Sequence, residues 1–129
     1  MNRYQIELSE DQMRLIIDCL DDIGRFASGQ WQLRYTIEEM VRGLPFDEQM
    51  KRRNEVEELL RQAKRILLPT FADNQSFGYD GTVFIGNTYQ ISRTMLHQLA
   101  MDHNWDNVYS SPALPSGTFG TIKINLLKP

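Results

Sequence analysis

Apolar residues recur at helical spacing in three separate segments of this chain, and this repeat constrains the fold more than any other feature. The repeat is clearest in residues 47–68, where steps of three and four residues join Val56, Leu59, Leu60, Ala63, Ile66 and Leu67. Such steps place side chains on one face of an α-helix. We therefore predict a long amphipathic helix that is capped by Asp47 and ended by Pro69.

Two further long helices and one short helix are predicted on either side of it. Ser9 and Gln12 form a capping box for a helix from Glu10, whose core stripe is Met13, Ile16, Leu20, Ile23 and Ala27. A second capping box from Thr36 opens a short helix that Gly43 and Pro45 close. Asn87 or Thr88 is expected to cap the last helix, which points Ile91, Met95, Leu96 and Leu99 inward.

Short segments near both ends alternate apolar and polar residues, as half-buried strands do. These segments contain Tyr4, Ile6 and Leu8 at one end, and Ile122, Ile124 and Leu126 at the other. Each strand has an obvious partner in the other. We predict a single domain over 1–129 that is mainly α, with three long helices, one short helix and a small antiparallel β-ribbon pairing the N- and C-terminal strands; an α+β arrangement is the alternative.

Composition limits the partners. The sequence contains no run of about 18 apolar residues that could span a bilayer, and its start lacks the apolar core of a signal peptide, so we expect a cytoplasmic protein and no membrane partner. The net charge of −3 argues against binding to long nucleic acids.

Charge is uneven along the chain. Residues 1–24 hold six acidic groups against two arginines, whereas residues 51–65 hold six basic groups against three glutamates. Such segments can attract each other within or between subunits, and solvated helix faces are the alternative interpretation.

The first helix carries more apolar surface than one packing neighbour needs. Leu15, Cys19 and Phe26 form a row beside its core stripe. We expect a second helix contact there and a homo-oligomer, either a dimer or a tetramer. Cys19 is the single cysteine, which excludes an internal disulfide and a cysteine-based metal cluster.

Catalytic signatures are missing from the sequence. It contains no G-x-S-x-G nucleophile elbow, no P-loop and no G-x-G-x-x-G motif. The two histidines, His97 and His103, are six residues apart and fall on different helix faces, which disfavours a metal site. We expect no catalytic residues, no metal and no cofactor.

The residues that remain are suited to binding a ligand. Tyr89, Arg93 and His97 follow one another at i, i+4 and i+8 on the last helix and form a polar ridge. Arginine can grip a phosphate, tyrosine can stack on a base, and histidine can donate to an oxygen. A hydrogen-bond cluster between helices explains the ridge equally well.

Residues 69–87 form a long segment without an apolar repeat, which is unusual in a small domain. Here Asn74 and Ser76 could contact base edges or ribose, and Phe77 and Tyr79 could stack on bases. The tail repeats this chemistry, and the end of the first helix adds polar groups; the further candidates are Arg25, Gln30, Tyr109, Ser111 and Ser116. A tight turn or an Ω-like loop that closes the core is the alternative.

Together these segments resemble a family of small phage-encoded proteins. The resemblance rests on "ELSEDQ…LDDIGRFASGQ", "NQSFGY", "YQISRTMLHQ" and "VYSSPALPSG". Such proteins are similar to the anti-CBASS sponges, which bind cyclic oligonucleotide immune signals as oligomers without cleaving them. The resemblance implies a non-enzymatic sponge in the infected bacterial cell, with a cyclic di- or trinucleotide or an ADP-ribose derivative as ligand. Two alternatives stay open: an inhibitor that contacts a host defence enzyme, and a small phosphodiesterase-like enzyme using His97 and His103.

Overall fold

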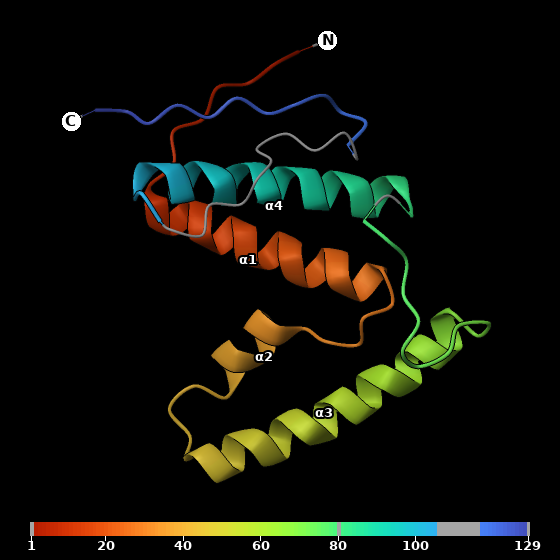
Figure 1. Ribbon diagram of the computed structural model, residues 1–129. Helices are drawn as coiled ribbons and strands as arrows, with labels where there is room; N and C mark the ends of the chain where they lie inside the picture. The colour runs from red at the N-terminus through yellow and green to blue at the C-terminus, as the bar shows by residue number, and fades with distance from the viewer. Residues whose placement is uncertain (1, 80, 106–116, 129) are drawn as a thin grey trace.

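The computed structural model describes residues 2–79, 81–105 and 117–128, and in these ranges it is mainly helical (Figure 1). Four helices follow one another along the chain: α1 (Glu10–Ala27), α2 (Arg34–Met40), α3 (Phe46–Leu67) and α4 (Val83–Asp102). The prediction of three long helices and one short helix is confirmed. None of the described helices is long and apolar enough to cross a membrane.

The α1 helix begins where its capping box places it. Ser9 Oγ accepts a hydrogen bond from the Gln12 backbone N–H at 3.1 Å, and Gln12 Oε1 accepts one from the Ser9 backbone N–H at 2.8 Å. Two of the amide donors that a helix start leaves unpaired are thereby satisfied.

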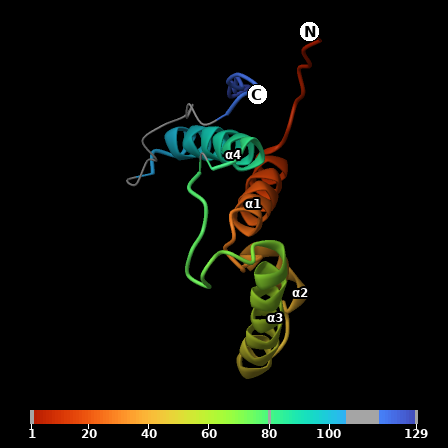
Figure 2. The same cartoon turned by 90° about the vertical axis from the view of Figure 1, so that its right-hand side faces the viewer.

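Helices α1 and α4 pack closely and form the main body of the molecule (Figures 1 and 2). Gly24 allows their close approach, since a Cβ atom at this position would lie 2.7 Å from Thr88 Oγ1. The buried apolar residues in this body are Ile17, Ile85, Leu99 and Ala100. Hydroxyl and amide side chains of α4 are buried beside them, namely Asn87, Thr88, Gln90, Ser92 and Thr94.

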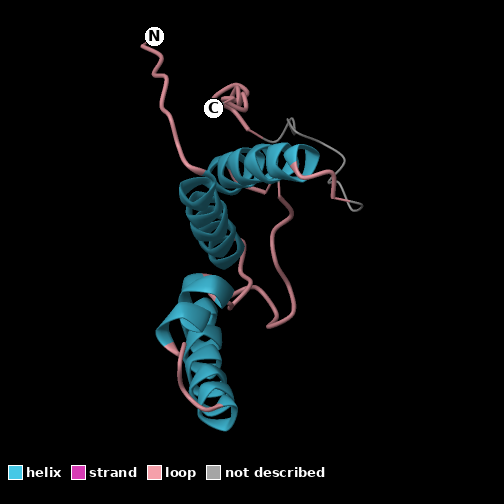
Figure 3. Ribbon diagram, turned by 90° about the vertical axis from the view of Figure 1, so that its left-hand side faces the viewer, coloured by secondary structure: helices cyan, strands magenta, loops and turns pink. Residues whose placement is uncertain are grey.

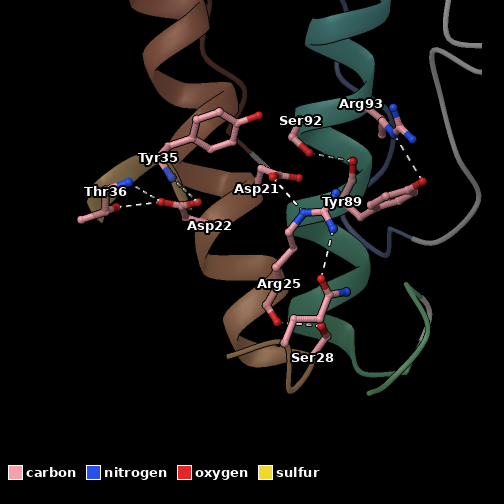
Figure 4. A network of polar contacts seen from close by, with 10 residues as sticks. Asp21, Asp22, Arg25, Ser28, Tyr35, Thr36, Tyr89, Ser92 and Arg93 are labelled. Carbon is pink, nitrogen blue, oxygen red and sulfur yellow. Dashed lines mark hydrogen bonds and ion pairs between the residues drawn. The ribbon is translucent and has the colours of Figure 1, made fainter. Parts of the chain in front are cut away.

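The start of α2 differs from the prediction, because the helix begins at Arg34 rather than after Thr36. Its N-terminus is satisfied by a carboxylate from α1 instead of by its own cap. Asp22, which is 2% exposed, accepts hydrogen bonds from the backbone N–H groups of Tyr35 and Thr36 and from Thr36 Oγ1 (Figure 4). This tertiary cap fixes α2 against α1.

The α3 helix has the predicted length, but Pro45 rather than Asp47 precedes it and its apolar face does not enter a core. Leu59 is 63% exposed, Ile66 79% and Leu67 65%. The side of α3 that is covered carries Lys64 instead. Figures 1 and 2 show the reason: α3 continues beyond α2, away from the α1–α4 pair.

The α4 helix starts at Val83, earlier than predicted, with Thr82 as its N-cap. Thr82 Oγ1 accepts from the Ile85 backbone N–H at 3.1 Å. Asn87 lies inside the helix, where its amide binds the C-terminal segment: Asn87 Oδ1 accepts from Thr118 N at 2.9 Å, and Asn87 Nδ2 donates to Thr118 Oγ1 at 3.0 Å.

The predicted β-ribbon does not form in the described ranges, which contain no strand (Figure 3). The segment 2–9 is exposed, with Tyr4 at 83% and Ile6 at 73%. The segment 117–128 is instead held to α4 by Asn87. A pair of short strands is marginal in water without further packing, so the contact with α4 outweighs strand pairing.

Candidate functional site

Residues from α1, α4 and the loop between α3 and α4 enclose a cavity of about 100 Å³, which we call the α1–α4 cavity. Five predicted ligand-binding residues, Arg25, Gln30, Phe77, Tyr79 and Tyr89, meet there. The other lining residues are Leu20, Asp21, Gly24, Ser28, Ile85, Thr88 and Ser92.

Three hydrogen bonds to the backbone of the loop hold it against the helices. The backbone N–H of Phe77 donates to the Ser28 carbonyl at 2.7 Å, at the C-terminal end of α1. Nearer the start of the loop, the buried ammonium group of Lys64 donates to the carbonyls of Asp73 and Gln75. The distance to the Asp73 carbonyl is 2.8 Å. The loop is therefore tied to α1 and α3 by its backbone, which leaves its aromatic side chains available to the cavity.

A stacked pair of tyrosines forms one side of the cavity. The rings of Tyr79 and Tyr89 lie with centroids 5.1 Å apart and planes inclined by 20°. Tyr79 is 50% exposed, so part of this residue remains open to solvent beside Tyr89. Phe77 instead packs on Phe71, with centroids 4.8 Å apart. Of the two loop aromatics, Tyr79 has the exposed ring on which a flat ligand could stack.

Figure 4 shows two arginines near Tyr89: Arg25 on α1, which lines the cavity, and Arg93 on α4, which does not. On the α4 side, Arg93 Nε donates to the Tyr89 hydroxyl at 3.2 Å, and its guanidinium lies 5.3 Å from the ring centre. On the α1 side, Arg25 Nε donates to Asp21 at 2.9 Å and Arg25 Nη1 donates to Gln30 Oε1 at 3.1 Å. These contacts orient Arg25 across the mouth of the cavity.

The hydroxyl groups around the cavity point their protons into the helices. Ser28 Oγ donates to the Arg25 carbonyl at 2.7 Å, and Ser92 Oγ donates to the Tyr89 carbonyl at 3.1 Å. Thr88 Oγ1 donates to the Ile85 carbonyl at 2.9 Å. With their protons committed, these oxygens offer only lone pairs. The lining thus combines the guanidinium donors of Arg25 with hydroxyl acceptors, which suits a ligand carrying both phosphate oxygens and amino groups.

Acidic groups lie next to the cavity on α1. Burial, followed by the charges of Asp21 and Asp22, raises the pKa of Asp18 above its ordinary value. Burial and the charges of Asp21 and Asp18 likewise raise the pKa of Tyr35. This negative potential limits how much anionic charge a ligand can bring to the α1 side.

The remaining predicted residues fall elsewhere. Asn74 and Ser76 line a separate cavity of about 150 Å³ with Gln30, Trp31 and Lys64. His97 is half-buried two turns beyond Tyr89 on α4 and does not line the α1–α4 cavity. Tyr109, Ser111 and Ser116 lie outside the described residues. The structure thus brings together part of the predicted set.

Sequence reasoning missed Asp21, Thr88 and Ser92 as cavity residues. Their spacing gives no hint of a shared site, since a sequence does not show which faces of α1 and α4 meet. The one available signal was the small residue Gly24 between apolar positions, which permits close helix packing.

Another cavity, of about 180 Å³, lies between residues 32–37 and α3. It is lined by Arg34, Arg53 and Glu57 among others, and the buried Nε of Arg53 has no hydrogen-bond partner among the described residues. Its described lining contains no aromatic side chain. The α1–α4 cavity therefore fits a base-containing ligand better.

Comparison with known proteins gives no match to a family model, a curated protein or a solved structure. Among the described residues, no three His, Cys, Asp or Glu side chains gather closely enough to hold a metal ion.

Proposed function

We propose that this protein is a non-enzymatic phage anti-defence protein that binds and sequesters a small nucleotide-derived immune signal as an oligomeric sponge. The ligand class is a cyclic di- or trinucleotide or an ADP-ribose derivative. The resemblance of the sequence to small phage proteins and anti-CBASS sponges supports this proposal.

The observation that carries the proposal is the tyrosine pair with its flanking arginines. Tyr79 is half-exposed and stacks on Tyr89, Arg25 lines the cavity beside them, and Arg93 donates to the Tyr89 hydroxyl. Nucleotides need both a stacking surface and phosphate donors, and arginine supplies the donors in a fixed fork. The hydroxyl acceptors of Ser28 and Ser92 complement base amino groups.

The size of the cavity indicates how much of the ligand one chain can hold. Sites for drug-sized molecules occupy roughly 300–1,000 Å³, whereas the α1–α4 cavity has about 100 Å³. One chain therefore encloses only a base or a phosphate group. The rest of a cyclic oligonucleotide would lie on Tyr79 and extend toward a second subunit, in keeping with an oligomeric sponge.

Calorimetry tests the proposal directly. Purified protein is titrated with cyclic di-AMP, cyclic di-GMP, cyclic tri-AMP and ADP-ribose, and the expected result is saturable binding of one of them. For that ligand, Tyr79→Ala should raise the Kd by about tenfold or more, because stacking on one aromatic ring is worth roughly 1–3 kcal/mol. Arg93→Met should weaken binding to a similar extent.

Tyr4→Ala is the matched control, since Tyr4 lies on the exposed segment 2–9 and should leave the Kd unchanged. Absence of binding across the panel would refute the proposal. Equal loss of affinity in Tyr4→Ala and Tyr79→Ala would show that the cavity is not the site. Recovery of intact nucleotide after heating the complex separates a sponge from a phosphodiesterase.

A second candidate, an inhibitor that contacts a host defence enzyme, is supported by the Trp31 region. Arg61 on α3 lies over the Trp31 ring with its guanidinium 4.3 Å from the ring centre, and Trp and Arg are enriched at interface hot spots. This function predicts capture of one host protein that Trp31→Ala abolishes and Arg93→Ala does not affect.

A further inference from the structure

One face of α3 is apolar and exposed along three helical turns. We call it the α3 stripe; it consists of Val56, Leu59, Ala63, Ile66 and Leu67. Its exposed fractions reach 63% at Leu59 and 79% at Ile66. Contiguous apolar surface of this kind on a soluble chain marks a contact site.

A matching surface lies on α1. Leu15, Cys19 and Ile23 follow one another at i, i+4 and i+8, and we call them the α1 row. Leu15 is 64% exposed, Ile23 is 47% exposed, and Cys19 is exposed. The face of α1 that packs on α4 carries other residues, including Ile17 and Gly24. The α1 row is therefore left uncovered by the body of its own chain.

The charged residues that precede the two surfaces have opposite signs. Asp11 stands one turn before Leu15 on α1, and Arg52 stands one turn before Val56 on α3. Both are exposed, and Arg52 also pairs with Glu48 of its own helix at 2.9 Å. When the helices lie parallel with Val56 opposite Leu15, Asp11 faces Arg52 and Leu59 falls next to Cys19. Opposite charges at such positions fix the register of a contact.

The α3 stripe and the α1 row do not meet within one chain. Helix α1 packs on α4 and α2, while α3 extends away from it (Figures 1 and 2). We infer that the α3 stripe of one copy docks in parallel on the α1 row of a second copy. The α3 stripe of the second copy docks on the α1 row of the first in the same way. A twofold axis makes the two contacts identical, so one dimer covers both surfaces of both chains. The inference rests on the proposed function only in taking the protein to be an oligomer.

Disulfide cross-linking tests this arrangement with the native cysteine. Leu59→Cys places a second thiol on the α3 stripe, where it should join Cys19 of the other copy on mild oxidation. The expected product on a non-reducing gel is a dimer of two 15.1 kDa chains. Peptide mass spectrometry should identify the link between Cys19 and the thiol introduced at position 59.

A control thiol and two possible cross-links distinguish this arrangement from contact between two α3 stripes and from contact within one chain. Asn54→Cys puts an exposed thiol on the opposite face of α3 and should not cross-link. A dimer from the double variant Cys19→Ser/Leu59→Cys would mean that two α3 stripes meet, which overturns the inference. A link between Cys19 and the introduced thiol within a monomer would mean that α3 closes on its own α1, with the same consequence.

Charge reversal tests the register without added thiols. Arg52→Asp should weaken the dimer about tenfold or more in analytical ultracentrifugation, and adding Asp11→Arg should restore it. Ile66→Asp should dissociate the dimer, while its circular dichroism stays that of the folded chain. A wild-type chain that stays monomeric, or a dimer that ignores Arg52→Asp and Ile66→Asp, overturns the inference. Nucleotide binding is measured separately, so a dimer that binds no nucleotide fails the proposed function alone.

Discussion

The buried carboxylate of Asp22 should be one of the largest single side-chain contributions to the stability of this protein. It is 2% exposed and accepts three hydrogen bonds from the start of α2, at 3.2 Å from Tyr35 N and at 2.8 Å from both Thr36 N and Thr36 Oγ1. Replacing it by alanine leaves two backbone donors of α2 without a partner. At about 1 kcal/mol for each of the three bonds, Asp22→Ala should lower the free energy of unfolding by about 3 kcal/mol.

Asp22→Asn should cost less, because the amide keeps one oxygen acceptor and can preserve part of this network. We expect a loss of about 1–2 kcal/mol. Urea unfolding followed by circular dichroism measures both values. For a chain of this size, about 3 kcal/mol corresponds to a fall in Tm of roughly 10 °C.

Asp21→Asn is the matched control at the neighbouring position. Asp21 pairs with Arg25 one turn away, and half of the Arg25 side chain is exposed. Such a pair contributes roughly 0–1 kcal/mol. A loss below about 1 kcal/mol in Asp22→Ala, or an equal loss in Asp21→Asn, would refute the role of Asp22 as the cap of α2.

Three other side chains give further predictions for urea unfolding and proteolysis. Asp18→Asn should raise the free energy of unfolding at pH 7, because burial and neighbouring acids raise the pKa of Asp18 and so disfavour its ionised form in the fold. This gain in stability should disappear below about pH 3.8, the ordinary pKa of an aspartate, where the carboxyl is neutral in both states. Lys64→Met should leave two loop carbonyls without a donor and make the loop at least about tenfold more sensitive to thermolysin, while Lys51→Met should not. The hydrogen bond and charge of Arg65 hold the pKa of Asp73 below its ordinary 3.8, so this carboxyl contributes stability above pH 3.8 that is lost as the pH falls through the lowered pKa. In Asp73→Asn this part of the loss of stability should be missing as the pH falls below about 3.8, the ordinary value for an aspartate.

The helices themselves could be predicted because their signals are local. Ser9 and Gln12 are close in sequence, so the capping box at the start of α1 could be recognised without tertiary information. The apolar repeat of residues 47–68 predicted a helix of nearly the observed length. In each case the hydrogen bonds that form the element join residues three or four positions apart.

Two helix starts were predicted wrongly: the start of α2 depends on a distant group, and the start of α4 is capped by Thr82 rather than by Asn87. The α2 helix begins before its apparent capping box because Asp22, which is 13 positions from Tyr35, satisfies its first amides. Asn87 looked like a cap for α4, but it binds residue 118 across the fold. Side chains that cap in one context serve as tertiary hydrogen-bond partners in another.

The residue types of the candidate site could be recognised in the sequence, but the sequence did not show which of these residues meet. Arg25, Tyr79 and Tyr89 were each identified by residue type, but only the packing of α1 on α4 shows that they meet while Asn74 and His97 lie elsewhere. The same holds for the apolar repeat of α3. The sequence alone determined that one face of this helix is apolar, because periodicity is a property of neighbouring residues; whether that face is buried depends on where the chain places the helix, and here it stays exposed because α3 extends away from α1 and α4.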